Sequence, residues 1–153
     1  MTESEERAWR ALQLMQMRLD GELARQLAAD SDLSYSDYAV LVALTDRPDG
    51  RMRLFELAGI LGWEKSRLSH HVNRMAGRGL VKKEKCDTDR RGAYVVAAPR
   101  GRKELEAAAP GHVEAVRRLF IDQLTSEQLA AIGAAAETIL AALEESTDSG
   151  TNE

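Results

Sequence analysis

The sequence predicts a mainly α-helical chain that carries one small β-hairpin. Over most of the 153 residues, apolar side chains recur at steps of three and four, which is the spacing of helices with one buried face. Residues 81–98 differ, because two short apolar runs there flank the turn-like sequence DTDRRG. Two helices separated by a glycine come directly before this hairpin, and that order is typical of a winged helix-turn-helix.

Length and composition fit one globular domain over residues 1–153. Hydrophobic residues make up 44% of the chain and charged residues 30%, so a core can form. A single cysteine gives no disulfide framework, which is typical of a reducing cytoplasm. Since neither a signal-peptide pattern nor a run of about 18 apolar residues occurs, we expect a soluble cytoplasmic protein without membrane contact.

The first two helices are predicted from an apolar stripe and a capping residue. A helix over Glu5–Ala29 places one stripe on a single face: Trp9, Leu12, Met15, Leu19, Leu23 and Leu27. The polar run ADSDLS ends this helix. Ser34 then caps a second helix that carries Tyr38, Leu41, Val42 and Leu44. The sequence RPDG at residues 47–50 predicts the turn that follows.

The helix-turn-helix is predicted from two glycines that end helices. A third helix over Arg53–Leu61 is ended by Gly62, and a fourth over Glu64–Arg78 is stopped by Gly79. At 100° per residue, the apolar side chains of the fourth helix cluster inward: Leu68, Val72 and Met75. The opposite face, which we call the reading face, holds Ser66, Ser69, His70 and Asn73, with Arg67 and Arg74 on one flank.

The reading face has no apolar residue and no acid, whereas a merely solvated helix face usually mixes Glu with Lys. Arginine pairs with guanine O6 and N7, asparagine favours adenine, and serine or arginine holds phosphates. The face is therefore predicted to enter the major groove of double-stranded DNA, with an ordinary surface helix as the alternative. His71 lies beside the inward stripe, so we expect it to pack rather than to read a base.

The hairpin predicts a second DNA contact. Its loop places Arg90 and Arg91 side by side at an exposed tip, and the narrow minor groove is a natural acceptor for such cations. Asp87 or Asp89 can aim one guanidinium by a salt bridge, and the alternative is a brace within the loop. The lysines of the first strand, Lys82, Lys83 and Lys85, either touch phosphates or keep an edge strand soluble.

The two last helices are predicted over residues 101–122 and 126–145, and the tail from Ser146 to Glu153 is predicted to be disordered. Thr125 and Gln128 give a capping box. The last helix shows a heptad-like stripe: Leu129, Ile132, Ala136, Ile139 and Leu143. A basic module over residues 34–99 is too small to cover these stripes, so we expect residues 5–30 and 101–145 to pair two chains into a homodimer.

Charge separates the same regions. Residues 47–103 contain 15 Lys and Arg against 6 Asp and Glu, a net charge of +9, although the whole chain carries −4. The remaining residues therefore carry −13. Charge distribution rather than pI indicates nucleic-acid binding.

Other kinds of site are not predicted. A zinc site would have to gather His70, His71, His112 and Cys86 from distant segments, without a CxxC or HxxxH unit, so we expect no metal and no cofactor. No nucleophile elbow, phosphate loop or carboxylate pair occurs, so we expect no enzyme. A winged-helix module that binds only proteins is the alternative function, but it predicts an uncharged or acidic reading face.

The sequence GWEKSRLSHHVNRMAGRGLV followed by DTDRRGAYVV resembles the recognition helix and wing of MarR-family transcriptional regulators, particularly those of actinobacteria. The resemblance extends from about residue 6 to residue 144. It implies a winged helix-turn-helix within an obligate helical dimer that binds palindromic promoter sites, commonly as a repressor, although activation stays open. Such a protein is nucleoid-associated when bound to DNA.

The resemblance also assigns roles by position. The residues that fall in the major-groove helix are Lys65, Ser66, Arg67, Ser69, His70 and Arg74. The family's aspartate-x-arginine wing pattern matches Asp89-Arg90-Arg91, which favours Arg91 as the minor-groove residue and Asp89 as its brace. Asp87 with Arg90 is the competing alignment. The chain departs from the common Leu-Thr after the second strand, where it has Ala97-Ala98-Pro99.

Many family members release DNA when a small phenolic or other aromatic compound binds between the dimer helices and the DNA-binding part. The residues that correspond to this crevice are Trp9, Met15, Tyr38 and His112, with ordinary core or interface packing as the alternative. Relatives that sense peroxide carry a reactive cysteine near the N-terminus. Since Cys86 lies at the base of the wing instead, thiol sensing is not expected.

Overall fold

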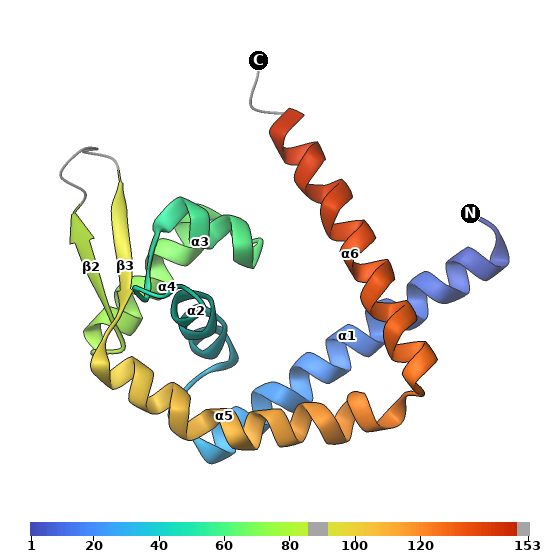
Figure 1. The fold of residues 1–153 in the computed structure, drawn as a ribbon, viewed down its shortest axis with the longest axis horizontal. Coiled ribbons are helices and arrows are strands. Elements are labelled where there is room, and N and C mark those ends of the chain that lie inside the picture. Colours follow the sequence, from blue (N-terminus) through green and yellow to red (C-terminus); the bar gives the residue numbers. More distant parts are fainter. Residues whose placement is uncertain (86–91, 150–153) are drawn as a thin grey trace. The chain divides into compact units, whose positions relative to one another are not determined.

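The computed structural model describes residues 1–85 and 92–149, and Figure 1 shows the order of their elements. The helices are α1 (Glu3–Asp30), α2 (Tyr35–Thr45), α3 (Leu54–Leu61), α4 (Lys65–Gly77), α5 (Pro99–Leu119), the 3-10 turn η1 (Ile121–Gln123) and α6 (Ser126–Ser149). The strands are β1 (Arg51–Arg53), β2 (Val81–Lys85) and β3 (Ala93–Ala97). The chain divides into two compact units, one up to Val113 and one from Glu114 onward.

The predicted fold class, mainly α with a small β wing, is confirmed. The two predicted strands pair antiparallel, from Val81 opposite Ala97 to Lys85 opposite Ala93. A third strand, β1, was not predicted, and it pairs with the other edge of β3. Three residues with the sequence RMR carry no local strand signal, because their conformation depends on pairing with β3 and on burial of Met52.

The core of the first unit lies where α2, α3 and α4 meet the sheet (Figure 1). Each of these elements contributes a fully buried side chain: Leu41, Leu57, Val72 and Val95. The predicted inward stripe of α4 is confirmed, because Leu68, Val72 and Met75 are all 0% exposed. Burial of these side chains stabilises the unit by roughly 1.5–3 kcal/mol for each residue.

Helix boundaries follow the predicted caps closely. The Ser34 hydroxyl accepts a hydrogen bond from the Asp37 backbone N–H at 3.0 Å, and Thr125 and Gln128 form the expected capping box. Gly62 has a φ of +63°, the left-handed conformation that ends α3. The fifth helix starts at Pro99, two residues before the predicted start at residue 101, because proline suits the first helical position.

The last helix extends to Ser149, beyond its predicted end at residue 145. The residues predicted to begin a disordered tail, from Ser146 to Ser149, are therefore helical. The Ser146 hydroxyl donates to the Ala142 carbonyl at 2.8 Å, and neither glycine nor proline occurs between Gly133 and Gly150. Residues 150–153 lie outside the described part.

Apolar side chains of α1 and α6 remain uncovered in a single chain. On α1, Leu23 and Leu27 are buried, whereas Trp9 is 51% exposed and Leu12 and Met15 are also exposed. The exposed apolar residues of α6 are Ile132, Ile139, Leu140 and Leu143. In the described residues, no helix has both the length and the hydrophobicity needed to cross a membrane.

Candidate nucleic-acid interface

The predicted reading face lies on the solvent side of α4. Five of its six residues are exposed and Ser69 is partly exposed; Lys65, which comes directly before them on α4, is also exposed and is included in the reading face from here on. The exposed residues are Lys65, Ser66, Arg67, His70, Asn73 and Arg74. Since Leu68 and Met75 hold the opposite side of α4 in the core, these side chains are presented together on one surface.

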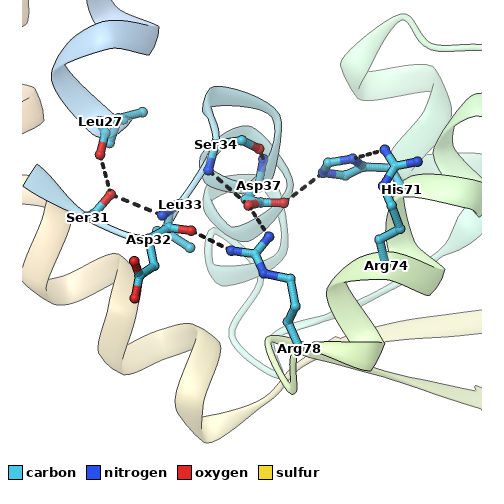
Figure 2. Close-up of polar contacts among 9 residues, drawn as sticks. All are labelled: Leu27, Ser31, Asp32, Leu33, Ser34, Asp37, His71, Arg74 and Arg78. Atoms are coloured by element: carbon cyan, nitrogen blue, oxygen red, sulfur yellow. Dashed lines mark hydrogen bonds and ion pairs between the residues drawn. The ribbon is translucent and has the colours of Figure 1, made fainter. Parts of the chain in front are cut away.

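One buried carboxylate, that of Asp37, fixes α4 against α2. Asp37 is 1% exposed and belongs to the first turn of α2, where its Oδ2 accepts from the Ser34 backbone N–H at 2.9 Å. From α4, His71 Nε2 lies 2.9 Å from Asp37 Oδ1, and Arg78, the residue that follows α4, donates from Nη1 to Asp37 Oδ2 at 2.6 Å (Figure 2). We call Asp37, His71 and Arg78 the Asp37 cluster.

The contacts of the cluster keep the Asp37 carboxyl ionised. Burial alone would raise the pKa of Asp37. The polar contact with His71, the backbone hydrogen bond from Ser34 and the hydrogen bond and charge of Arg78 outweigh that effect. They hold the pKa of Asp37 well below its ordinary value, so at neutral pH the cluster contains a buried anion with fixed partners.

Arg78 also ties a loop to the end of α4. Its Nη2 donates to the backbone carbonyl of Asp32, which lies between α1 and α2. Figure 2 shows the guanidinium between this carbonyl and the Asp37 carboxylate. Arginine suits this position because it has several donors in one rigid plane. Arg78 therefore attaches the C-terminal end of α4 to two places, the loop before α2 and the first turn of α2.

His71 links the buried cluster to the reading face. Its Nδ1 lies 3.1 Å from Nη2 of Arg74, which is exposed. Because a guanidinium can only donate, Nδ1 must accept this hydrogen bond. The other ring nitrogen, Nε2, faces Asp37. His71 packs inward as predicted, but its two polar partners were not predicted.

The sheet adds positive charge beside α4. Lys83 of β2 donates to Asn73 Oδ1 at 3.0 Å, so the Asn73 amide group keeps its own donors for other partners. On the opposite face of the sheet, Arg51 and Arg53 of β1 lie over the Tyr94 ring, at 4.0 and 5.2 Å from its centre. This arrangement was missed because it depends on the unpredicted strand β1.

The predicted wing-tip residues, Asp87, Asp89, Arg90 and Arg91, lie outside the described residues, as does Cys86. The last described pair of the hairpin joins Lys85 to Ala93. The roles of the tip residues therefore stay predictions. Lys82 is exposed on β2, which is an edge strand as expected.

The structure brings together two of the four predicted effector residues. The rings of Tyr38 and His112 are 4.4 Å apart, and Tyr35, which was not predicted, lies 6.1 Å from His112. Burial lowers the pKa of His112 and raises the pKa of Tyr38. Trp9 and Met15 instead lie exposed on α1, at 51% and 37%.

Two buried polar atoms near this aromatic cluster lack partners. Among the described residues, neither His112 Nδ1 nor Gln26 Oε1 has a hydrogen-bond partner. Gln26 lies against the backbone next to His112, since a Cβ placed on Gly111 would be 3.2 Å from Gln26 Nε2. Buried polar groups without partners are uncommon in proteins. Over the same residues, no three histidine, cysteine or acidic side chains gather as a metal site would require.

Comparison with known proteins identifies relatives over much of the chain. Residues 31–92 match the MarR family. Transcriptional regulator HosA of Escherichia coli is 34% identical over 98 residues, which are 63% of this chain and 70% of HosA. AbsC, a MarR family transcriptional regulator from Streptomyces coelicolor, is 36% identical with a TM-score of 0.87, over 95% of this chain and 97% of AbsC.

A second Streptomyces coelicolor regulator of the MarR family, Sco3205, was solved in complex with DNA. It is 36% identical, with a TM-score of 0.86, over 91% of this chain and 87% of the Sco3205 chain. The similarity to AbsC and Sco3205 therefore includes the dimerisation and DNA-binding regions that were predicted from the sequence.

Replacing Asp37 by asparagine should lower the free energy of unfolding by about 2–4 kcal/mol, because His71 and Arg78 lose a buried anionic partner. Asp32→Asn is the matched control, since Asp32 contributes only its backbone carbonyl to Arg78. Urea denaturation at pH 7 measures both variants. Equal stability of the two variants would contradict the role of the Asp37 cluster.

The stabilisation by Asp37 should depend on pH in one direction. Because the pKa of Asp37 is lowered by folding, its contribution is complete above the ordinary aspartate pKa of about 3.9 and is lost as the pH falls further. The difference in stability between the wild type and Asp37→Asn should therefore shrink as the pH falls below about 4.

Proposed function

The chain belongs to the MarR family of DNA-binding transcriptional regulators, and we propose that it represses promoters by binding a palindromic DNA site as a homodimer. The observation that carries this proposal is the reading face of α4, which is exposed, basic and free of acids from Lys65 to Arg74. Such a surface complements the polar, negatively charged major groove.

The side chains of the reading face divide into two roles. Arg67 and Arg74 have guanidiniums that can pair bidentately with guanine, and the Asn73 amide is suited to adenine. Lys65, Ser66, Ser69 and His70 are suited to phosphates or to single hydrogen bonds with base edges. In Sco3205, a relative of the same fold, the structure contains bound DNA, which supports this kind of interface.

Two further groups of cations extend the proposed interface. Arg91, braced by Asp89, inserts into the minor groove at the wing tip, with Arg90 as the alternative. Lys82 lies on the same face of the sheet as Arg51, since both are opposite Val96. Because Arg51 forms an ion pair with Glu84 at 3.6 Å, Lys82 is the residue that adds positive charge for phosphates. Contacts to phosphates hold the protein on DNA without reading its sequence.

Dimerisation explains both the exposed apolar residues and a palindromic site. Trp9 and Leu12 of α1 and Ile139 and Leu143 of α6 are exposed in one chain, and a second copy would remove them from water. A two-fold axis then places two α4 helices about one DNA turn apart, roughly 34 Å. The protein acts on chromosomal DNA, which places it in the cytoplasm at the nucleoid.

A small aromatic effector fits the cluster around His112. The rings of Tyr35, Tyr38 and His112 offer stacking surfaces, and His112 Nδ1 and Gln26 Oε1 are buried without partners. A hydroxylated aromatic acid supplies both a ring and polar groups for these atoms. Binding there releases DNA in this proposal, because α2 carries Tyr38 and also Asp37, which fixes α4.

The alternative function, a winged-helix module that binds only proteins, has less support. It predicts a reading face without a strong positive charge. The observed face exposes Lys65, Arg67 and Arg74, and no acid lies between them.

Arg67→Ala should reduce discrimination between DNA sequences by about 1–3 kcal/mol, because a bidentate contact to one base pair is lost. Lys82→Ala is the matched comparison, since it should weaken all sequences alike and reduce the salt dependence by about one ion. The probes are a palindrome selected by the wild-type chain from random duplexes and its single-base variants. If Arg67→Ala leaves affinity and preference unchanged, the assignment of the reading face is wrong.

Ile139→Glu should shift the chain from dimer to monomer, because it places a charge in the proposed apolar interface. Ala141→Glu is the control on the opposite side of α6, also exposed, and should leave the dimer intact. Sedimentation equilibrium gives the molecular mass of each variant. A wild-type monomer, or a dimer in Ile139→Glu, would count against the proposed interface.

Monohydroxybenzoates should release the selected palindrome at lower concentration than benzoate, because only they carry a hydroxyl that can hydrogen-bond to the unpartnered polar atoms. His112→Ala should weaken this release by about tenfold while the chain still binds DNA, since a ring and a polar partner are lost. Mobility-shift titrations measure release. If none of the three monohydroxybenzoate isomers (ortho, meta and para) released DNA, the proposed effector class would be wrong.

A further inference from the structure

We propose that Trp63 is a positioning residue that holds the Arg67 guanidinium ready to read a base, and that Trp63 thereby contributes to sequence discrimination through Arg67. This inference rests on the proposed role of Arg67 in the reading face. Trp63 lies two residues before the start of α4.

The position of Trp63 is fixed by the turn between α3 and α4. Gly62 adopts a φ of +63°, and the Trp63 backbone N–H then donates to the Ala58 carbonyl at 3.0 Å. The side chain is partly buried and packs against the hydrophobic core of the first unit. The indole is therefore anchored by the helix-turn-helix itself.

Arg67 lies on the face of this indole. Its Cζ is 4.3 Å from the Trp63 ring, within the range of a cation–π contact. Arg67 is exposed, and within residues 1–85 and 92–149 no carboxylate forms an ion pair with it. The indole is thus the group that orients this side chain before DNA arrives.

A buried residue supports the indole in turn. The His71 ring meets the Trp63 ring edge-on, at 5.6 Å between centres and an angle of 87°. His71 is itself held at Asp37, 2.9 Å away. A continuous series of contacts therefore runs from the buried carboxylate to the exposed guanidinium, through His71 and Trp63.

An indole is well suited to this task because it orients a cation without neutralising it. A carboxylate would also restrict Arg67, but it would occupy the N–H donors and cancel the charge that DNA requires. Stacking leaves the donors at the edge of the guanidinium free for guanine. It also reduces the entropy that the long side chain would otherwise lose on binding.

A double-mutant cycle tests the proposal with the full chain and the selected palindrome. Trp63→Leu removes the aromatic face, and Trp63→Phe retains one. Fluorescence anisotropy should show two- to tenfold weaker binding for Trp63→Leu, roughly the loss of one such contact, with reduced discrimination against single-base variants. Trp63→Phe should stay close to the wild type. In an Arg67→Ala background, Trp63→Leu should have no additional effect.

The cycle separates this inference from the proposed function. If Trp63→Leu weakened DNA binding equally in the wild-type and Arg67→Ala backgrounds, Trp63 would have a purely structural role and the inference would be wrong. The role of Arg67 as a reading residue would then be unaffected. If Arg67→Ala alone changes nothing, the reading-face assignment and this inference both fail.

A spectroscopic measurement on the wild type keeps the inference testable if Trp63→Leu does not fold. The side-chain protons of Arg67 should show upfield NMR shifts from the indole ring current. Arg47, which is also exposed, serves as the reference. An unshifted Arg67 signal would overturn the inference.

Discussion

The arrangement of the first unit, which carries the reading face, depends on the buried carboxylate of Asp37. An ionised group that is 1% exposed is tolerated only when it has polar or charged partners, and here such partners approach it from three directions. Ser34 supplies the start of α2, and His71 and Arg78 come from the middle of α4 and the residue that follows it. Since each partner constrains the direction of approach, the cluster sets the orientation of α4, which apolar packing alone leaves less specific.

Because of this constraint, the two sides of α4 have different roles. The inward side chains determine where the helix lies, and the outward side chains determine what it binds. His71 connects the sides, because one ring nitrogen faces Asp37 and the other accepts from Arg74. Arg67 and Arg74 are both oriented by aromatic or imidazole groups that carry no negative charge, so both arginines keep their charge for DNA.

The sequence was sufficient to predict the parts of the structure that arise from local patterns. Helical spacing correctly placed Leu68, Val72 and Met75 in the core, and Ser34 and Gly62 marked helix boundaries because caps depend on neighbouring residues. The strand β1 and the aromatic partner Tyr35 were missed. Both depend on segments that are distant in the chain, and no local signal distinguishes them.

The Asp37 cluster was missed for a related reason. Asp37 follows Ser34 at the spacing of a capping box, a motif that usually stays at the surface. Its partner Arg78 lies 41 residues later, so only the folded chain shows that the same carboxylate serves both a helix start and a long-range ion pair. The DNA-binding roles themselves stay predictions, because they depend on a duplex and, for the wing tip, on residues outside the described part.

The central claim is that two copies of α4 enter adjacent major grooves with their outward faces toward the DNA. A cleavage reagent tethered to α4 tests it most directly. Gly77→Cys, in a Cys86→Ser background, places iron-EDTA on the side of α4 that carries His70, where a Cβ meets nothing within 4 Å. Gly133→Cys on α6 is a control with equally open surroundings. We expect two clusters of DNA cleavage about one helical turn apart for Gly77→Cys and none for Gly133→Cys. Cleavage from Gly133→Cys alone, or uniform cleavage from Gly77→Cys, would contradict it.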